Sequence, residues 1–261
     1  MEYVLITGAT SGIGYALAEV FAAKGYALIL VGRSTKKLEK TKEAIQMLMM
    51  RERKTVNQIV LITQDLSEET AARSIYETVI EKKLKVSFLI NNAGAGYAGE
   101  FWEASDEKIM ELTSLNIVQL TLLTKYFAKD MKLAGKGKIL NVASTGAYHP
   151  GAYIGVYYAT KAYVLSLSEA LYEELRPYGV TVSSLCPGAT LTGFQKASGR
   201  KDTKLAMKPE FVANKAYIGL MKNKKVIVPG LRNKFMVKIP RAIGIQVIKR
   251  YQKSTLLSQK D

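Results

Sequence analysis

Short apolar runs alternate with longer amphipathic stretches from the first residues of the chain to residue 228. The runs are rich in Val, Ile and Leu and are nearly continuous, which is typical of strands buried on both faces of a parallel sheet. Charged or turn-forming residues bound each run. The pattern predicts seven strands, at Tyr3–Thr7, Ala27–Val31, Gln58–Thr63, Val86–Ile90, Lys138–Val142, Val180–Leu185 and Val226–Val228.

The stretches between these runs predict helices. Ser67, followed by Glu68 and Glu69, is expected to cap the third helix, because acidic residues stabilise a first helical turn. Ser105 is expected to be a weak cap for the fourth. The expected helices are Gly12–Lys24, Ser34–Arg53, Glu68–Lys83, Ser105–Ala134, Gly155–Tyr178 and Pro209–Met221.

Strands that alternate with helices indicate an open, doubly wound α/β sheet of the Rossmann type. We expect a seven-stranded parallel sheet with helices on both faces, and ligands beyond the carboxyl ends of the strands. The 261 residues fit a single domain, residues 1–261. Within it, residues 229–261 form a basic amphipathic C-terminal extension that Pro240 and Gly244 divide, so one long helix is not expected there.

The positive charge is concentrated at the C-terminal end. Of the net charge of +16, residues 196–261 contribute +14, from 17 basic and 3 acidic residues. Such an end can cover its own fold or a partner subunit, lie on an anionic membrane surface, or bind an acidic ligand such as the phosphate of an acyl carrier. No nucleic-acid-binding motif accompanies the charge, so we expect no nucleic acid partner.

The expected cellular compartment rests on sequence features that this chain does not show. No apolar run reaches the roughly 18 residues of a membrane span, and the N-terminus enters a strand without a signal sequence. Cys186 is the only cysteine and is expected to be a small buried residue, so no disulfide can form within the chain. We expect a cytoplasmic protein, with peripheral membrane contact as an open alternative.

A glycine-rich turn follows the first predicted strand. It reads Thr7-Gly8-Ala9-Thr10-Ser11-Gly12-Ile13-Gly14, a TGxxxGxG pattern that leads into a helix. Its backbone N–H groups and the helix dipole are suited to binding a pyrophosphate. The sequence therefore predicts a dinucleotide site that includes Gly8, Thr10, Ser11, Gly12, Ile13 and Gly14.

The end of the second strand indicates which nicotinamide cofactor is preferred. An acidic residue there would bind the ribose hydroxyls and repel a 2′-phosphate, but this chain has Gly32-Arg33-Ser34. The Arg33 guanidinium can hold a phosphate, and the Ser34 hydroxyl can add a hydrogen bond. We expect NADPH to be preferred over NADH; the alternative is a solvated Arg33 at a helix start.

Tyr157 and Lys161 stand four residues apart on a predicted helix, with Ser144 upstream. A lysine at this spacing is expected to stabilise the phenolate and lower the tyrosine pKa, which makes Tyr157 a proton donor near neutral pH. The neighbouring Tyr158 lacks such a lysine and is assigned to packing. His149, the sole histidine, is not needed for this chemistry, and a histidine-based metal cluster is not available.

On these motifs the chain resembles the short-chain dehydrogenase/reductase family, in its single-domain form, over nearly its whole length. Further matching pieces are Asp65-Leu66, Asn91-Asn92-Ala93-Gly94, Asn116, and Pro187-Gly188 followed by Thr192. The resemblance implies a fold and an order of sites like those predicted from the residues.

The resemblance also implies roles. Tyr157 would give a proton to the substrate oxygen, which Ser144 would hold, and Lys161 would also fix the nicotinamide ribose. Asn116 would hold a water that links Lys161 to solvent. The implied cofactor contacts are Asp65 at the adenine edge with Leu66 next to it in sequence, Asn91 near the adenine ribose, Ala93 and Gly94 after the fourth strand, Pro187 and Gly188 after the sixth, and Thr192 at the carboxamide.

The predicted activity is NADPH-dependent reduction of a ketone or aldehyde to an alcohol. Aromatic residues in the loops Ala95–Phe101 and Thr145–Ile154 and in the segment Ala189–Met207 favour an apolar substrate. The tail resembles that of 3-oxoacyl and hydroxysteroid-type reductases. The alternative is a non-catalytic NADP(H)-binding regulator on the same fold. The two long helices, Ser105–Ala134 and Gly155–Tyr178, resemble those through which family members form homo-oligomers.

Overall fold

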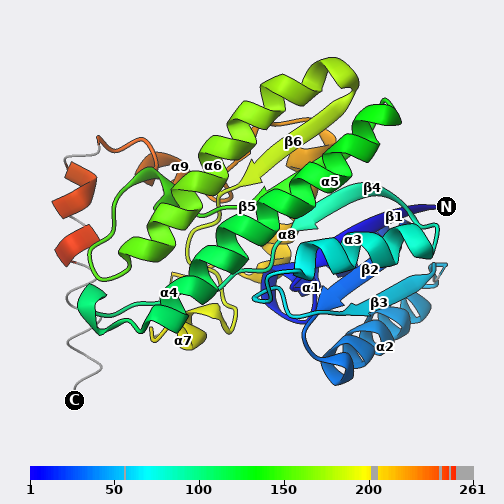
Figure 1. The fold of residues 1–261 in the computed structure, drawn as a ribbon, viewed down its shortest axis with the longest axis horizontal. Coiled ribbons are helices and arrows are strands. Elements are labelled where there is room, and N and C mark those ends of the chain that lie inside the picture. The colour runs from blue at the N-terminus through cyan, green and yellow to red at the C-terminus, as the bar shows by residue number, and fades with distance from the viewer. Residues whose placement is uncertain (56, 201–204, 241–242, 247, 251–261) are drawn as a thin grey trace.

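The structure is a computed structural model that describes residues 1–261 except 56, 201–204, 241–242, 247 and 251–261. Its centre is a parallel sheet in the order β3-β2-β1-β4-β5-β6-β7, which confirms the predicted doubly wound α/β fold (Figure 1). The end of the basic extension, 251–261, and part of the predicted substrate segment, 201–204, lie outside the described residues. The strands are β1 (Glu2–Thr7), β2 (Ala27–Gly32), β3 (Ile59–Thr63), β4 (Lys85–Asn91), β5 (Gly137–Val142), β6 (Val180–Leu185) and β7 (Val226–Ile227).

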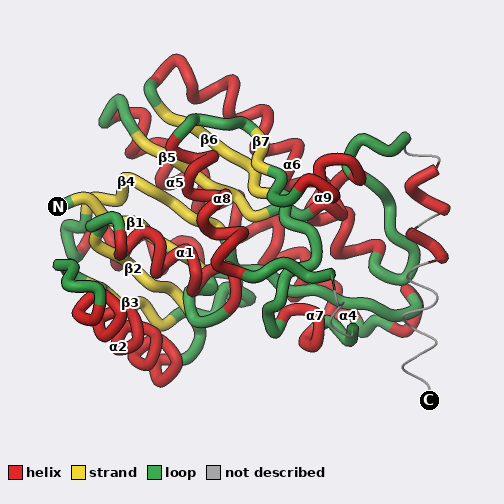
Figure 2. Tube along the Cα trace, turned by 180° about the vertical axis from the view of Figure 1, so that it is seen from behind, coloured by secondary structure: helices red, strands yellow, loops and turns green. Residues whose placement is uncertain are grey.

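Helices cover both faces of the sheet (Figures 1 and 2). One layer holds α1 (Gly12–Ala23), α2 (Thr35–Arg51) and α8 (Pro209–Met221), and the other holds α3 (Ala71–Glu81), α5 (Leu120–Leu133) and α6 (Gly155–Leu175). The short helices α4 (Asp106–Thr113), α7 (Phe194–Ala197) and α9 (Leu231–Met236) lie beyond the carboxyl ends of the strands. None of the helices in the described part of the chain is long and apolar enough to cross a membrane.

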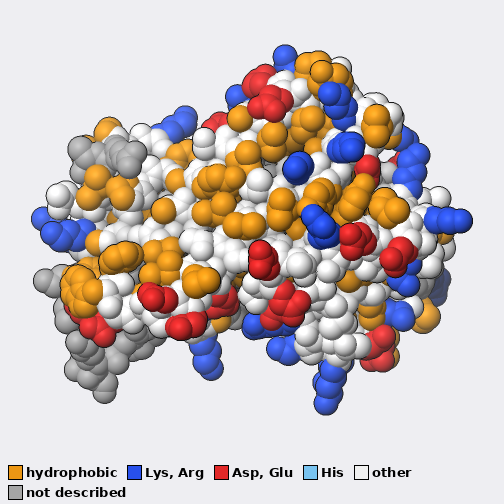
Figure 3. All heavy atoms as spheres, viewed as in Figure 1, with side chains coloured by type: hydrophobic (Ala, Val, Ile, Leu, Met, Phe, Trp, Pro, Cys, Tyr) orange, Lys and Arg blue, Asp and Glu red, His pale blue; other side chains and the backbone are white. Residues whose placement is uncertain are grey.

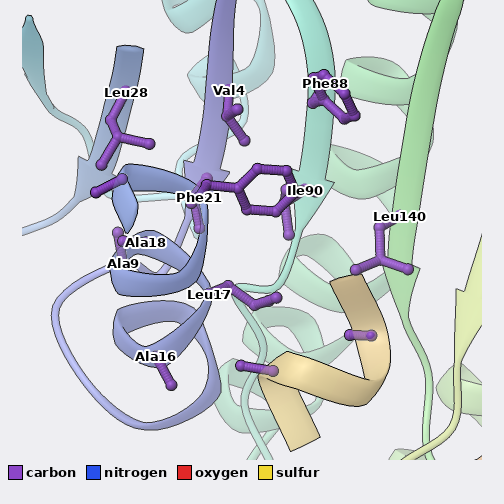
Figure 4. Packing of buried hydrophobic residues seen from close by; sticks show 14 of the residues in the cluster. Val4, Ala9, Ala16, Leu17, Ala18, Phe21, Leu28, Phe88, Ile90 and Leu140 are labelled. Atoms are coloured by element: carbon purple, nitrogen blue, oxygen red, sulfur yellow. The ribbon is translucent and has the colours of Figure 1, made fainter. Parts of the chain in front are cut away.

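Alternating side chains of the strands divide the core into two layers. Val4 and Ile6 of β1 pack on the side of α1, and Leu5 packs on the side of α3 and α5. Phe21 of α1 is fully buried against Phe88, 5.4 Å between ring centroids, and lies among apolar side chains of the sheet, including Val4 of β1 and Ile90 of β4 (Figure 4). These two layers hold the sheet between the helices.

The structure corrects the prediction that Ser105–Ala134 is one helix. The structure divides it into α4, a π-helical segment η2 (Ser114–Gln119) and α5. Ser105 does cap α4, because its side chain accepts a hydrogen bond from the Lys108 backbone N–H at 3.3 Å. π segments are rare and short, so a helical apolar pattern alone does not reveal one.

The start of the third helix is also corrected. α3 begins at Ala71, and Ser67 does not cap it. Ser67 instead donates from its backbone N–H and its hydroxyl to the Asp65 carboxylate, at 2.9 and 2.8 Å. The acidic residues that follow Ser67 therefore lie in a turn before the helix.

Truncation of Phe21 tests the core layer beneath the glycine-rich turn. Because its ring also contacts Tyr26 and Tyr217 edge-on, Phe21→Ala is expected to lower the free energy of unfolding by about 3–5 kcal/mol in urea denaturation. The control Phe101→Ala removes a ring that is 66% exposed and should change stability by less than about 0.5 kcal/mol. Equal effects of the two substitutions would contradict this assignment of the core.

Candidate active site

A cavity of about 810 Å³ opens at the carboxyl ends of the strands. Residues that directly follow strands line it, including Gly8 after β1, Arg33 after β2, Asn92 after β4 and Ala143 after β5. This is the edge of the sheet where a doubly wound fold places its ligands. Local sequence had located the individual motifs, and parallel pairing of the strands brings them together.

Most of the predicted site residues lie around this one cavity, although their positions were inferred from motifs far apart in the chain. They come from the glycine-rich turn, from the ends of β2 to β6 and from α6. The predicted residues that line the cavity are Gly8, Thr10, Ser11, Gly12, Ile13, Arg33, Asp65, Leu66, Ala93, Gly94, Ser144, Tyr157, Lys161, Pro187, Gly188 and Thr192.

The glycine-rich turn depends on the absence of side chains. Gly8 and Gly12 have φ values of 63° and 55°, which L side chains rarely adopt. Gly14 does not line the cavity; it is buried, and a Cβ there would overlap the Gly8 carbonyl oxygen. Gly14 therefore allows α1 to approach the turn closely, and this leaves a cradle of backbone N–H groups that fits the pyrophosphate of a dinucleotide.

Asn92 is a site residue that the sequence analysis did not assign. Its side-chain amide donates to the Thr7 and Gly8 carbonyl oxygens, at 2.9 and 3.1 Å, and it lines the cavity. The Thr7 hydroxyl in turn accepts from the backbone N–H groups of Asn92 and Ala93, both at 3.0 Å. These bonds join the turn after β1 to the end of β4.

Asn91 corrects the sequence prediction, which placed it at the cofactor ribose. It is 3% exposed and donates from its amide to Thr124 of α5 and Asn141 of β5, each at 2.9 Å. Successive side chains of a strand point to opposite faces, so Asn91 faces the helices while Asn92, beyond the strand, reaches the cavity. Asn91 braces the sheet and does not line the cavity.

The cavity end at β2 and β3 carries charge of both signs. Arg33 and Lys37 line it, and the Asp65 carboxylate lies there as well. Hydrogen bonds from Ser67 and the charge of Arg33 hold the pKa of Asp65 below its ordinary value. Ser34 was predicted to bind the 2′-phosphate, but it does not line the cavity. Its side chain caps α2 and accepts a hydrogen bond from the Lys37 backbone N–H at 3.4 Å. Two cations thus remain where a 2′-phosphate was expected.

Ser144 and Tyr157 come together in the middle of the cavity. Ser144 follows β5 and caps the short helix η3 (Thr145–Tyr148), where its Oγ accepts from the Gly146 backbone N–H at 3.0 Å. Tyr157 lies in the first turn of α6, with its ring 5.2 Å from that of Phe194. Burial raises the pKa of Tyr157, and a hydrogen bond with Ser144 opposes this shift. The phenol is therefore protonated at neutral pH.

Lys161 is almost fully buried, at 4% exposure. Its ammonium donates to the Val142 carbonyl oxygen at 2.8 Å and lies 5.8 Å from the centre of the Tyr157 ring. Burial lowers the pKa of Lys161 to about 8. Burial is the largest influence on the pKa of Tyr157 and raises it, while Ser144 and Arg200 oppose the shift; that Lys161 lowers this pKa stays a prediction.

Asn116 does not itself line the cavity but lies close to Lys161, since a Cβ at Gly94 would meet both Asn116 Oδ1 and Lys161 Nζ. It is fully buried within the π segment η2, where its amide exchanges hydrogen bonds with both backbone groups of Ala95, at 3.0 and 2.9 Å, and donates to Thr160 at 3.1 Å. The side chain braces the loop after β4 against α6. That Asn116 holds a water between Lys161 and solvent stays a prediction.

The substrate end of the cavity differs from the sequence prediction. Phe194, Leu205 and Met207 line it, but Phe101 and Trp102 are 66% and 74% exposed and do not. Tyr158 packs against Gly146 and Gly151 as predicted, and it also lines the cavity.

The C-terminal segment closes this end, which the sequence analysis missed. His149 Nε2 lies 3.3 Å from the Met236 carbonyl oxygen, and the cavity lining includes Arg232, Asn233, Met236 and Ile248. No local motif marks these residues, because only the folded chain brings the segment after β7 over the catalytic loop. The described part of the basic extension therefore packs on its own fold.

Two proteins of known name and one solved structure are similar to this chain. Human very-long-chain 3-oxoacyl-CoA reductase is 27% identical over 263 residues, 97% of this chain and 80% of the relative. Mouse 17-beta-hydroxysteroid dehydrogenase type 3 is 32% identical over 81% of this chain and 67% of the relative. A solved short-chain dehydrogenase from Sphingobium yanoikuyae, in complex with NADPH, matches with a TM-score of 0.82 and 30% identity over 93% of this chain and 98% of that chain.

Across the curated relatives, the chain spans between 61 and 80% of the relative's own length. The family model described as short chain dehydrogenase matches residues 2–203. The glycine cradle and a cavity that extends from Arg33 to Tyr157 fit a nicotinamide dinucleotide. The chain belongs to the short-chain dehydrogenase family of oxidoreductases.

Proposed function

We propose that this protein is an NADPH-dependent oxidoreductase that reduces an apolar ketone or aldehyde to the alcohol. The observation that carries the proposal is the meeting of Ser144, Tyr157 and Lys161 in the cavity that the glycine-rich turn opens into. Relatives named as 3-oxoacyl-CoA reductases and hydroxysteroid dehydrogenases support a substrate of this class.

Each member of the trio has a distinct task. The bound nicotinamide supplies the hydride that reaches the carbonyl carbon. Ser144 donates a hydrogen bond to the substrate oxygen, and Tyr157 gives its phenolic proton to that oxygen as the carbon–oxygen double bond becomes single. The phenolate that remains is stabilised by the buried Lys161 ammonium, because opposite charges attract more strongly away from water.

The raised pKa of Tyr157 suits this direction of reaction. A phenol that is protonated at neutral pH is ready to act as an acid. Lys161, with a pKa of about 8, is mostly protonated at pH 7 and carries the charge that the phenolate needs.

The preference for NADPH rests on Arg33 and Lys37. Both line the cavity end at β2, where a 2′-phosphate would lie, and no acid ends that strand. The preference for an apolar substrate rests on Phe194, Met207 and Met236, which line the other end.

A homo-oligomer is proposed through the face of η2, α5 and α6. Apolar side chains gather over these helices on the face seen in Figure 3, and among them Val118 and Tyr163 are 46% and 38% exposed. An apolar face of this kind is typical of a contact between subunits.

Removal of the Tyr157 hydroxyl tests the proton transfer. Tyr157→Phe is expected to lower kcat with NADPH and a long-chain ketone by about 100-fold or more, since general acid catalysis contributes roughly 10²–10⁴-fold. Dinucleotide affinity, measured by calorimetry, should stay within about threefold, because the ring remains.

The matched control is Tyr158→Phe, which removes the adjacent hydroxyl and should keep most of the turnover. Retention of more than about a tenth of kcat in Tyr157→Phe would exclude Tyr157 as the donor. If the unsubstituted protein binds the dinucleotide tightly but reduces no ketone, the result would favour the alternative function, a non-catalytic NADP(H)-binding regulator.

Reversal of the charge at Arg33 tests the cofactor preference. Arg33→Asp is expected to lower the ratio of kcat/KM for NADPH to that for NADH by at least about tenfold, since a hydrogen bond to a charged group contributes about 1.5–3 kcal/mol. The control Arg73→Asp makes the same change of charge on the exposed surface of α3 and should leave the ratio unchanged. An unchanged ratio in both variants would mean that Arg33 is a solvated side chain.

The proposed subunit contact is tested by adding a charge to it. Val118→Lys is expected to shift the protein from a dimer or tetramer to a monomer in light scattering after gel filtration, because a buried unpaired ammonium is unfavourable. Ile218→Lys on α8 is the control, since Ile218 is also 46% exposed and lies in the opposite helix layer. A monomeric unsubstituted protein, or an equal shift in both variants, would contradict this contact.

A further inference from the structure

We propose that His149 is a positioning residue, which holds the C-terminal segment against the loop of Ser144, and that this segment gives the site its preference for long ketones. The inference rests on the proposed function and names the feature that selects the substrate. We call residues 231–240 and 243–246 the cover; it begins with α9. His149 is the chain's single histidine, and the proposed proton transfer does not use it.

The cover lies at the carboxyl ends of the strands, where the orange to red part of the ribbon in Figure 1 passes beyond the sheet. Arg232, Asn233 and Met236 of the cover line the cavity, and so does His149. The cover therefore forms part of the wall of the cavity into which the proposed trio opens.

The place of His149 in the chain brings it to this wall. It ends the short helix η3, which Ser144 begins, so one short helix separates the two residues. Its backbone is extended, with φ −140° and ψ 145°, as expected for a residue that precedes a proline, here Pro150. His149 thus belongs to the loop that positions Ser144, while its ring contacts the cover.

The edge of the His149 ring contacts the end of α9. Nε2 lies 3.3 Å from the Met236 carbonyl oxygen, and Nε2 is the donor because a carbonyl oxygen only accepts. Met236 is the last residue of α9, and its carbonyl oxygen also accepts from the Ile239 backbone N–H at 3.2 Å. Carbonyl groups in a last helical turn lack partners within the helix, so these two donors fix the point at which the chain leaves α9.

The face of the same ring contacts a second part of the cover. Gly244 is buried, and a Cβ added there would lie 2.9, 3.0 and 3.1 Å from the Nδ1, Cε1 and Cδ2 atoms of His149. Only a glycine lets the backbone approach the ring this closely. Two separate parts of the cover, at Met236 and at Gly244, therefore meet on one side chain.

The other side of the cover is held independently of His149. The Asn233 amide donates to the Pro229 carbonyl oxygen at 2.8 Å and lies 3.5 Å from Met207 Sδ, and its side chain fills the space beside Gly188. Met207 and Gly188 also line the cavity. The cover thus joins the segment after β6 to the loop after β5, and loss of the His149 contact should loosen it at one side without removing it.

The contact with His149 fixes an apolar part of the cavity wall, because Met236 both accepts the hydrogen bond and lines the cavity. Each methylene group of a substrate that packs on an apolar wall adds up to about fourfold in affinity. A looser cover should therefore weaken long ketones and spare short ones. If His149 instead serves only to hold Ser144, long and short ketones lose equally.

The test compares methyl butyl ketone with methyl octyl ketone. His149→Leu keeps the bulk of the side chain without a donor and should lower the octyl-to-butyl ratio of kcat/KM by about three- to tenfold, through the KM of the octyl compound. His149→Gln retains an N–H donor and should keep most of the ratio. Gly244→Ala should lower the ratio as well, because its Cβ would displace the cover from the ring.

The matched control is Gly155→Ala, which adds a Cβ at the exposed start of α6, in open space among the described residues, and should leave the ratio unchanged. Hydrogen exchange measures the cover without turnover. The amides of Lys234 and Val237, which are hydrogen-bonded to backbone carbonyl oxygens at α9, should exchange faster in His149→Leu and Gly244→Ala than in the unsubstituted protein.

An equal loss of kcat/KM with the two ketones would overturn the inference, and so would an unchanged ratio or unchanged exchange in both His149→Leu and Gly244→Ala. If the unsubstituted protein reduces neither ketone, the ratio is taken from their dissociation constants, measured by calorimetry with the NADP⁺-saturated protein. Weaker binding of the octyl ketone alone in His149→Leu would then support the inference, and only the proposed reaction would be overturned.

Discussion

The buried ammonium of Lys161 is the constraint on which the arrangement of the site depends. A charge at 4% exposure is stable only where its surroundings are fixed, and here it donates to the Val142 carbonyl oxygen at the end of β5. Gly94 leaves room beside it, since a Cβ there would lie 3.4 Å from Nζ and 3.1 Å from Asn116 Oδ1. The loop after β4, the end of β5 and α6 are thereby held in one relative position, and Tyr157 comes with α6.

Burial affects the acid and its neighbour in opposite directions. It raises the pKa of Tyr157 and lowers that of Lys161, because desolvation disfavours the charged form of each. The protein's own groups therefore keep the phenol neutral, and the hydrogen bond with Ser144 and the charge of Arg200 limit the shift. A proton donor of this kind keeps its proton at rest and would transfer it only as the substrate oxygen gains negative charge and becomes basic.

The sequence predicted the fold and most of the cavity lining because the relevant signals are local. Buried strands show as apolar runs, and a parallel sheet brings their carboxyl ends to one edge, so residues such as Gly8, Arg33 and Ser144 were correctly placed together. The failures involve geometry that composition does not carry. One residue of register separates Asn91 from Asn92, a short π segment interrupts a stretch that the apolar pattern predicts as one helix, and Ser34 caps α2.

The substrate end was the least predictable part, and the reason is physical. Phe101 and Trp102 are largely exposed and do not line the cavity, whereas Met236 reaches it because the segment of α9 lies against His149. The proposed trio lies just after β5 and on α6, whose positions the core fixes, whereas Phe194, Met207 and Met236 reach the cavity by tertiary contact. Membership of the family therefore accounts for the dinucleotide end of the site, and under the proposed function the choice of substrate falls to the residues that tertiary contact adds.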